Sequence, residues 1–212
     1  MATLSYRERP AAGDPAGLLM LHHGRGADEG DLLPLADHLD PQRQLHVVSP
    51  RAPLTLGGGP GYHWYLVPRV GHPDPGTFDA AYRQLAEFHD ETWERLGLTP
   101  EQTVLGGFSM GSVMSYALGL GPGRPAPAGI LAFSGFVPEV EGWRADLPRP
   151  SRVFIAHGLA DPIIEAGFAH RARRLLEEHG TDVSYHEGDY GHWIEPAHAA
   201  AAGDWLAETL PR

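Results

Sequence analysis

A serine between two glycines is the first feature of this sequence that could do chemistry. The segment Gly107-Phe108-Ser109-Met110-Gly111 reads G-x-S-x-G, and it lies between the apolar run 103–105 and an apolar stretch with helical character. Between a strand and a helix, this pattern places the serine on a sharp turn with its hydroxyl exposed above the sheet edge. The pattern therefore predicts Ser109 as a nucleophile, the alternative being a turn that is merely rich in glycine.

A nucleophilic serine needs a histidine that takes its proton and a carboxylate that orients the histidine. When the serine lies on such a turn, the acid and then the base follow it along the chain. Asp161 follows the apolar run 152–157, and His192 follows the last strand that we predict. Asp161 could instead only cap the helix that Pro162 would open. We predict Asp161 as the acid and His192 as the base.

Attack on a carbonyl also creates a negative oxygen, which backbone N–H groups can stabilise. One such donor is the N–H of Met110, directly after the serine. The second would come from the early strand-end loop Leu21-His22-His23-Gly24-Arg25-Gly26-Ala27-Asp28. The small residues at 24 and 26 would let the N–H of Arg25 approach a substrate, so we predict Arg25 and Met110 as the oxyanion donors.

Short apolar runs alternate with longer amphipathic segments along the chain, which is typical of an α/β fold with a mostly parallel central sheet and helices on both faces. We expect strands near residues 3–8, 18–22, 45–49, 103–108, 128–133, 152–157 and 182–187. We expect helices at 32–39, 77–96 (capped by Thr77), 110–120, 163–179 and from 196 through 206. The stretches 50–76 and 121–127 are expected to be irregular.

The composition excludes several mechanisms and partners. All 16 basic residues are arginine, and the sequence has no lysine and no cysteine. A cysteine nucleophile, a P-loop ATPase, a Schiff-base enzyme and a Ser-Lys hydrolase are therefore excluded. With 27 acidic residues the net charge is −11, which argues against nucleic acid and anionic membranes as partners because both require a basic face.

The length of 212 residues fits one domain over 1–212. The N-terminal region has no apolar run long enough for a signal or membrane-spanning segment, so we expect no membrane insertion and a cytoplasmic location. The 13 histidines raise the alternative of a metal-dependent hydrolase. They show no H-E-x-x-H or similar ligand spacing, so we predict no metal and no cofactor.

These motifs together resemble the phospholipase/carboxylesterase family of α/β-hydrolases, which includes bacterial carboxylesterases and acyl-protein thioesterases. The resemblance rests on L-H-H-G-R-G-A-D at 21–28, G-F-S-M-G at 107–111, A-F-S-G at 132–135, H-G-x-x-D-P at 157–162 and G-H at 191–192. It implies the α/β-hydrolase fold, the triad Ser109, Asp161 and His192, and backbone donors at Arg25 and Met110.

The resemblance also implies that the segment around Trp64 lines the acyl site, and His23 is the residue that matches the family's His-Gly. We predict His23, Trp64, Phe136 and Trp193 as substrate contacts, with core packing as the alternative for each aromatic residue. Only residues 134–151 separate the strands near 128–133 and 152–157, so no large cap domain is expected over the site.

We therefore expect a serine hydrolase that cleaves small carboxylic esters with short- to medium-chain acyl groups through an acyl-enzyme. The same triad would serve an acyl-thioester hydrolase or a lysophospholipase, and acyl transfer, peptide cleavage or perhydrolysis would differ only in the acceptor. A catalytically silent binding protein on the same fold is a more distant alternative. A homodimer is compatible with the sequence. From their positions, Arg25 and Arg69 suggest the hypothesis that an anionic acyl tail is favoured.

Overall fold

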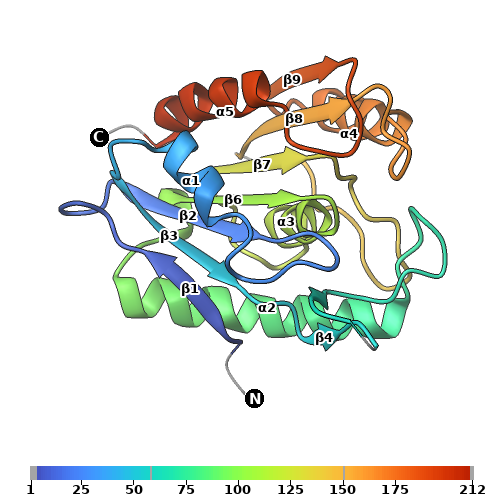
Figure 1. The fold of residues 1–212 in the computed structure, drawn as a ribbon, viewed down its shortest axis with the longest axis horizontal. Coiled ribbons are helices and arrows are strands. Elements are labelled where there is room, and N and C mark those ends of the chain that lie inside the picture. The colour runs from blue at the N-terminus through green and yellow to red at the C-terminus, as the bar shows by residue number, and fades with distance from the viewer. Residues whose placement is uncertain (1–3, 58, 150, 211–212) are drawn as a thin grey trace.

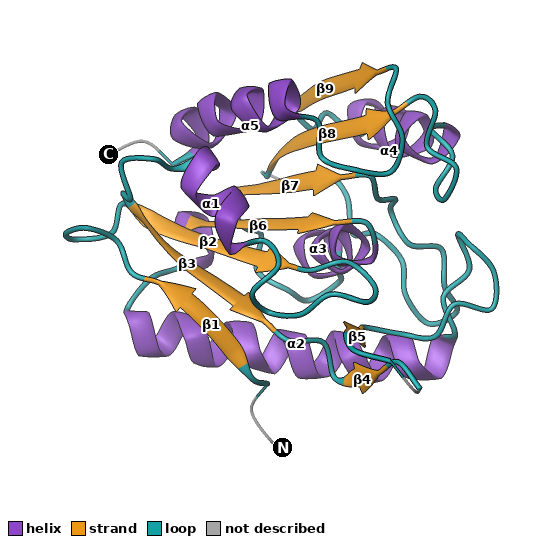
Figure 2. Ribbon diagram, viewed as in Figure 1, coloured by secondary structure: helices purple, strands orange, loops and turns teal. Residues whose placement is uncertain are grey.

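A seven-stranded, mostly parallel sheet forms the centre of the computed structural model (Figures 1 and 2). Its strands are β1 (Tyr6–Arg9), β2 (Gly17–His22), β3 (Leu45–Pro50), β6 (Thr103–Phe108), β7 (Gly129–Phe133), β8 (Arg152–Gly158) and β9 (Val183–Gly188). They lie in the order β1-β3-β2-β6-β7-β8-β9, with β1 antiparallel to β3 and the other pairs parallel. The α/β-hydrolase architecture predicted from the sequence is thus confirmed.

The structure describes residues 4–57, 59–149 and 151–210. The N-terminal strand that was expected near 3–8 lies at Tyr6–Arg9 instead, where it pairs with β3 from Val47 to Pro50. Residue 3 of that prediction lies outside the described residues.

Helices cover both faces of the sheet. α1 (Leu33–Leu39) and α5 (Pro196–Thr209) lie over one face, and α2 (Pro75–Leu96), α3 (Met110–Leu120) and α4 (Gly167–Glu178) lie over the other (Figure 1). Successive strand residues point to opposite faces. Along β2, Leu18 and Met20 therefore pack with α2 and α3, whereas Leu19 and Leu21 pack with α1 and α5.

Two helices begin two or more residues from their predicted starts. α2 begins at Pro75 because the Asp74 carboxylate accepts the N–H of Thr77 at 2.9 Å, so Asp74, not Thr77, is its cap. α4 begins at Gly167 instead of 163. Before it, the carboxylate of Asp161 accepts the N–H groups of Ile163 and Ile164 in a separate turn.

The long segment 50–76 is not wholly irregular, because it contains a two-stranded hairpin of β4 (Leu54–Thr55) and β5 (Tyr62–His63). A single 3₁₀ turn, Pro100–Gln102, precedes β6. The described residues between β7 and β8 form no helix, so no large cap covers that edge of the sheet, as predicted. Among the described helices, none is long and apolar enough to cross a membrane.

Two histidines are buried in the core between β2 and the helices α2 and α3. His22 Nδ1 lies 2.8 Å from Ser115 Oγ, and its Nε2 lies 3.1 Å from His89 Nε2. The Ser115 hydroxyl donates to the carbonyl of Gly111 at 3.0 Å. Because that hydroxyl proton is used, His22 Nδ1 must donate to Ser115, and His22 Nε2 accepts from His89. This chain of donors requires the His22 imidazole to be neutral, because its Nε2 accepts a hydrogen bond.

Burial favours the neutral form of these histidines. It lowers the pKa of His22 to about 3, with a further contribution from His23, and it lowers the pKa of His89 well below its ordinary value. A depressed folded-state pKa stabilises the fold fully above the unfolded pKa of about 6.5, and this stabilisation is lost as the pH falls toward the folded pKa.

We therefore predict that the free energy of unfolding falls by about 2 kcal/mol for each of the two histidines between pH 7 and pH 5. In His89→Gln the amide can still donate to His22, and one titrating group is removed. The pH-dependent loss should then be about 2 kcal/mol smaller than in the native chain, measured by urea unfolding at the two pH values.

His38 on α1 is exposed and provides the matched control. His38→Gln should leave the pH-dependent loss unchanged. An equal loss in the native chain and in His89→Gln would show that His89 does not remain neutral in the folded state.

Candidate active site

Ser109 lies on the turn between β6 and α3 in a backbone conformation that is rare for a residue with a side chain. Its φ is 54° and its ψ is −119°. The turn is held because the N–H of Ser109 donates to the carbonyl of Phe133 at 2.9 Å. A Cβ on Gly107 would collide with the backbone of Gly111, and a Cβ on Gly111 would collide with the carbonyl of His22. The two glycines of G-x-S-x-G are therefore required by close backbone approach.

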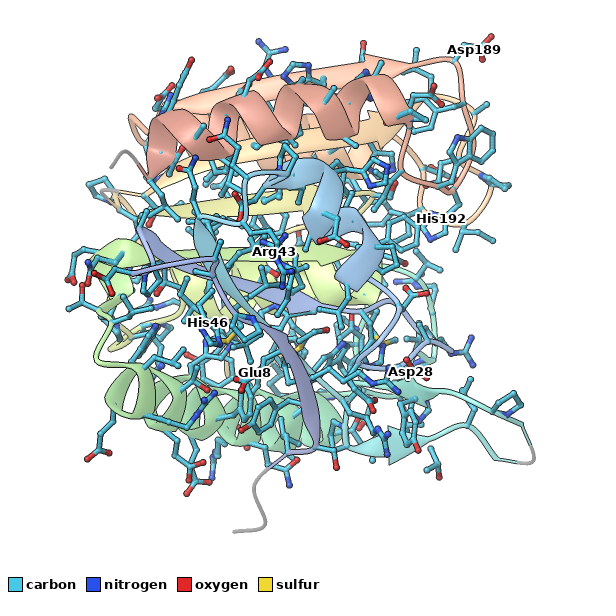
Figure 3. All side chains as sticks on the ribbon, turned by 60° about the vertical axis from the view of Figure 1, so that its left-hand side comes forward. Glu8, Asp28, Arg43, His46, Asp189 and His192 are labelled. Atoms are coloured by element: carbon cyan, nitrogen blue, oxygen red, sulfur yellow. The ribbon has the colours of Figure 1, made fainter. Side chains whose placement is uncertain are left out.

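A chain of hydrogen bonds joins the three residues predicted as a triad. His192 lies on the loop that follows β9 (Figure 3), and its Nε2 is 2.9 Å from Ser109 Oγ. Its Nδ1 is 2.6 Å from the Oδ2 of Asp161, which follows β8. The three side chains meet because the carboxyl ends of β6, β8 and β9 lie at the same edge of the sheet.

This geometry fixes the protonation of the imidazole. A carboxylate oxygen only accepts, so Nδ1 of His192 carries the proton and Nε2 is free to accept the proton of the Ser109 hydroxyl. The Asp161 side chain is fully buried, whereas 17% of the His192 side chain is exposed. The His192 imidazole is therefore reachable from solvent and the Asp161 carboxylate is not.

Three hydrogen-bond donors keep the buried Asp161 carboxyl charged. Burial by itself would raise its pKa, but the hydrogen bond from His192 and those from the N–H groups of Ile164 and Ile163 outweigh burial, and the pKa is lowered. The two backbone bonds reach Oδ1 at 2.8 and 2.9 Å. The carboxylate thus has both oxygens occupied in the orientation that His192 needs.

His157 supports this acid and was not identified from the sequence. It is fully buried, its Nε2 donates to the carbonyl of Ile164 at 2.7 Å, and the same nitrogen lies 3.4 Å from Asp161 Oδ2. Burial lowers the pKa of His157, against the hydrogen bond to Ile164 and the charge of Asp161. The available signal was its position as the first residue of H-G-x-x-D-P at 157–162.

The loop predicted to supply an oxyanion donor is anchored by the β4–β5 hairpin. Gly26 donates its N–H to the carbonyl of Tyr62 at 2.8 Å, and Tyr62 donates to the carbonyl of Ala27 at 2.9 Å. Within the described part of the chain, the N–H groups of Arg25 and Met110 have no acceptor. Both residues line the same cavity as Ser109.

His23 and Trp64 were expected to contact substrate, but the structure places both beneath this loop. His23 donates from Nδ1 to the carbonyl of Gly24 at 2.8 Å and accepts the N–H of Ala52 on Nε2 at 3.0 Å. The Trp64 indole donates to the carbonyl of His23 at 2.9 Å. Both side chains are fully buried and do not line the cavity. They hold the loop in place.

The cavity at Ser109 has a volume of about 420 Å³. Phe136, which was expected to contact substrate, lines it together with Leu56, Tyr65, Val67, Arg69, Val70, Ile163 and Ile164. Trp193 does not line it, contrary to expectation. Its ring is 52% exposed, packs on Tyr190 with centroids 5.8 Å apart, and donates to Glu195 at 3.1 Å. Packing on its own loop therefore keeps Trp193 outside the cavity.

Among the described residues, no group of three or more histidine, aspartate or glutamate side chains could hold a metal ion.

The conformation of Ser109 leads to a prediction about stability. At an ordinary helix or strand position, a protein with glycine is less stable than one with alanine by about 0.5–1 kcal/mol. At φ 54° and ψ −119° the backbone of any residue that has a Cβ is strained, and such conformations cost about 1–3 kcal/mol. Ser109→Gly should therefore be about 1 kcal/mol more stable than Ser109→Ala in urea unfolding. Greater stability of the alanine variant would show that the turn is not strained.

Comparison with known proteins gives a consistent set of relatives. An acyl-protein thioesterase 1 from Neurospora crassa is 32% identical over 82% of this chain and 76% of its own length. The carboxylesterase of Bacillus cereus has a similar structure, with a TM-score of 0.87 at 25% identity, covering 98% of this chain and 95% of the esterase. The crystal structure of esterase PE8 gives a TM-score of 0.85 at 30% identity, over 98% and 100% of the two chains.

The relatives named here are thus an acyl-protein thioesterase and two esterases, and the two esterase structures share the fold of this chain. The model of the phospholipase/carboxylesterase family matches residues 9–210. The chain belongs to the phospholipase/carboxylesterase family of α/β-hydrolases.

Proposed function

We propose that this chain is a serine hydrolase that cleaves carboxylic esters with short- to medium-chain acyl groups through an acyl-enzyme. The observation that carries the proposal is the unbroken hydrogen-bond chain from Asp161 through His192 to Ser109. The hydroxyl at the end of that chain lines a cavity of about 420 Å³, where an ester can reach it.

In the first half of the reaction, Ser109 Oγ attacks the ester carbonyl and its proton passes to His192 Nε2. The imidazolium that forms is stabilised by the charged Asp161, which is already hydrogen bonded to Nδ1. The carbonyl oxygen becomes negative and accepts hydrogen bonds from the free N–H groups of Arg25 and Met110. The positive end of the α3 dipole, at Met110, stabilises this negative charge further.

The alcohol then leaves with the proton from His192, and the acyl group stays on Ser109. A water molecule gives its proton to His192, attacks the acyl-enzyme and releases the acid. The cavity is lined mostly by apolar side chains, among them Leu56, Val67, Phe136 and Ile164. This surface suits a short or medium hydrocarbon chain, which loses apolar area to water when it is bound.

Thioester hydrolysis is the second candidate function, because the same acyl-enzyme forms and only the leaving group differs. The relative from Neurospora crassa, which carries the name acyl-protein thioesterase 1, favours it. Comparing kcat/KM for the oxygen ester and the thioester of one acyl group separates the two candidates.

The nucleophile is tested with p-nitrophenyl butyrate. The native chain should release p-nitrophenolate, and Ser109→Ala should lower kcat by at least about 10³-fold, because the covalent route is lost. Ser5→Ala at an exposed position is the matched control and should keep full activity. Equal activity in the native chain and Ser109→Ala would show that Ser109 is not the nucleophile.

The role of the acid is tested with Asp161→Asn. The amide keeps the size of the side chain, but its NH₂ group would favour the tautomer of His192 in which Nε2 carries the proton and cannot accept one. We expect kcat to fall by about 10⁴-fold while the far-ultraviolet circular dichroism spectrum is unchanged. A loss of less than tenfold would mean that Asp161 does not set the tautomer of His192.

A further inference from the structure

The cavity at Ser109 carries positive charge without a matching negative charge. Arg25 and Arg69 line it, and no aspartate or glutamate is among its described lining residues. This is unexpected in a chain with a net charge of −11, since acidic side chains outnumber basic ones elsewhere on the molecule.

The pattern of ion pairs shows that this positive charge is available. Most arginines of the described chain pair with a carboxylate, for example Arg51 with Glu29 at 2.5 Å. The described arginines without a carboxylate within 4 Å are Arg25, Arg43, Arg69, Arg144, Arg171 and Arg174. All except Arg43 line the cavity at Ser109 or the neighbouring cavity, which shares Gly71, His72 and Phe136 with it.

The neighbouring cavity is lined by Arg144, Arg171 and Arg174, but Glu139 and Glu178 also line it. Its charge is therefore partly balanced, and it lies farther from the nucleophile. The unbalanced pair is the one beside Ser109, formed by Arg25 and Arg69.

Arg25 is not neutralised by the acidic residue next to it in the loop. The carboxylate of Asp28 accepts the N–H of Gly30 at 2.7 Å and forms no ion pair with Arg25. The charge of Arg25 acts on its surroundings, because the pKa of His63, lowered first by burial, is lowered further by Arg25.

Arg69 is held at the cavity by the turn that carries it. The N–H of His72 donates to the carbonyl of Arg69 at 2.9 Å, and Asp74 and Thr77 tie the other end of the segment to Leu66 at 2.9 and 3.0 Å. The guanidinium donates to Nε2 of His72. A guanidinium has five N–H donors in a planar fork, so donors remain for a ligand.

We propose that Arg25 and Arg69 bind an ionised carboxylate at the far end of the acyl chain, so that the preferred substrate is a monoester of a dicarboxylic acid. The inference rests on the proposed function, because Ser109 must attack the ester carbonyl at the near end. The ester C–O bond breaks, the alcohol leaves with the proton held by His192, and water releases the dicarboxylic acid. The distal carboxylate is unchanged throughout.

The cavity has an apolar part beside Ser109 and a charged part at the two arginines, and this arrangement fits such a substrate. Phe136 and Ile164 are buried beside Ser109, where methylene groups would pack, whereas both arginines are exposed. The carboxylate would stay partly hydrated, so its desolvation cost is small. Bonds to a charged group at such a site change affinity by about tenfold.

The test compares p-nitrophenyl hydrogen adipate with p-nitrophenyl hexanoate, which have the same chain length and differ only in the terminal carboxylate. Ser109→Ala gives the uncatalysed background for each ester. In the native chain kcat/KM should be about tenfold higher for the adipate, and Arg69→Gln should remove most of this preference. Arg25→Gln, which keeps the backbone N–H, should reduce it as well.

Arg43→Gln is the matched control, because Arg43 also lacks a carboxylate partner but lines neither cavity. It should leave the preference unchanged. Raising the ionic strength from about 0.02 to about 0.5 M should lower kcat/KM for the adipate more than for the hexanoate, because the attraction is screened.

The outcomes separate the two proposals. Hydrolysis of hexanoate without a preference for adipate, or a preference that survives Arg69→Gln and Arg25→Gln, overturns the carboxylate site and leaves the esterase proposal standing. A preference that falls equally in Arg43→Gln assigns the effect to overall charge and also overturns the site. Failure to cleave either ester above the Ser109→Ala background overturns both proposals.

Discussion

The site depends on keeping a charged carboxylate buried at the edge of the sheet. Asp161 is shielded from water, and burial alone would favour its neutral form. The N–H groups of Ile163 and Ile164 occupy one oxygen and His192 occupies the other. These bonds orient the imidazole, and the two backbone bonds hold the turn between β8 and α4 in place. One local arrangement therefore sets both the electrostatics of the site and the path of the backbone beside it.

Buried histidines support the catalytic edge from below without facing the cavity. His157 ties the turn after β8, His23 ties the loop at Arg25, and the pair His22 and His89 reaches the first turn of α3 through a serine hydroxyl. Each uses one nitrogen as a donor and the pKa of each is lowered by burial. Neutral imidazole suits these places because it donates a hydrogen bond at a fixed angle while adding no charge near Ser109.

The sequence predicted the features that follow from strand order and from backbone collisions. Ser109, Asp161 and His192 each follow a recognisable apolar strand, and parallel strands bring their carboxyl ends to one edge, so their proximity could be predicted. The positions of His23, Trp64 and Trp193 could not, because an aromatic residue in a loop has no periodic pattern that shows which side it buries. Trp64 is buried in the core cluster and donates to the carbonyl of His23. The start of α4 could not be predicted either, because an aspartate before a proline is equally typical of a helix cap.

The distribution of charge indicates which features serve the fold and which serve a ligand. Arg9 is buried and pairs with Asp40 at 2.6 Å, and Arg51 is bound to Glu29. In both pairs the carboxylate is buried, so losing its arginine would destabilise the fold. Arg25 and Arg69 have no such partner, are exposed, and stand at the rim of an apolar cavity. Their charge contributes little to stability, since exposed arginines lose little hydration on folding. Such side chains, which the fold does not require, can differ between members of one family without a change of fold, and they can therefore set substrate choice.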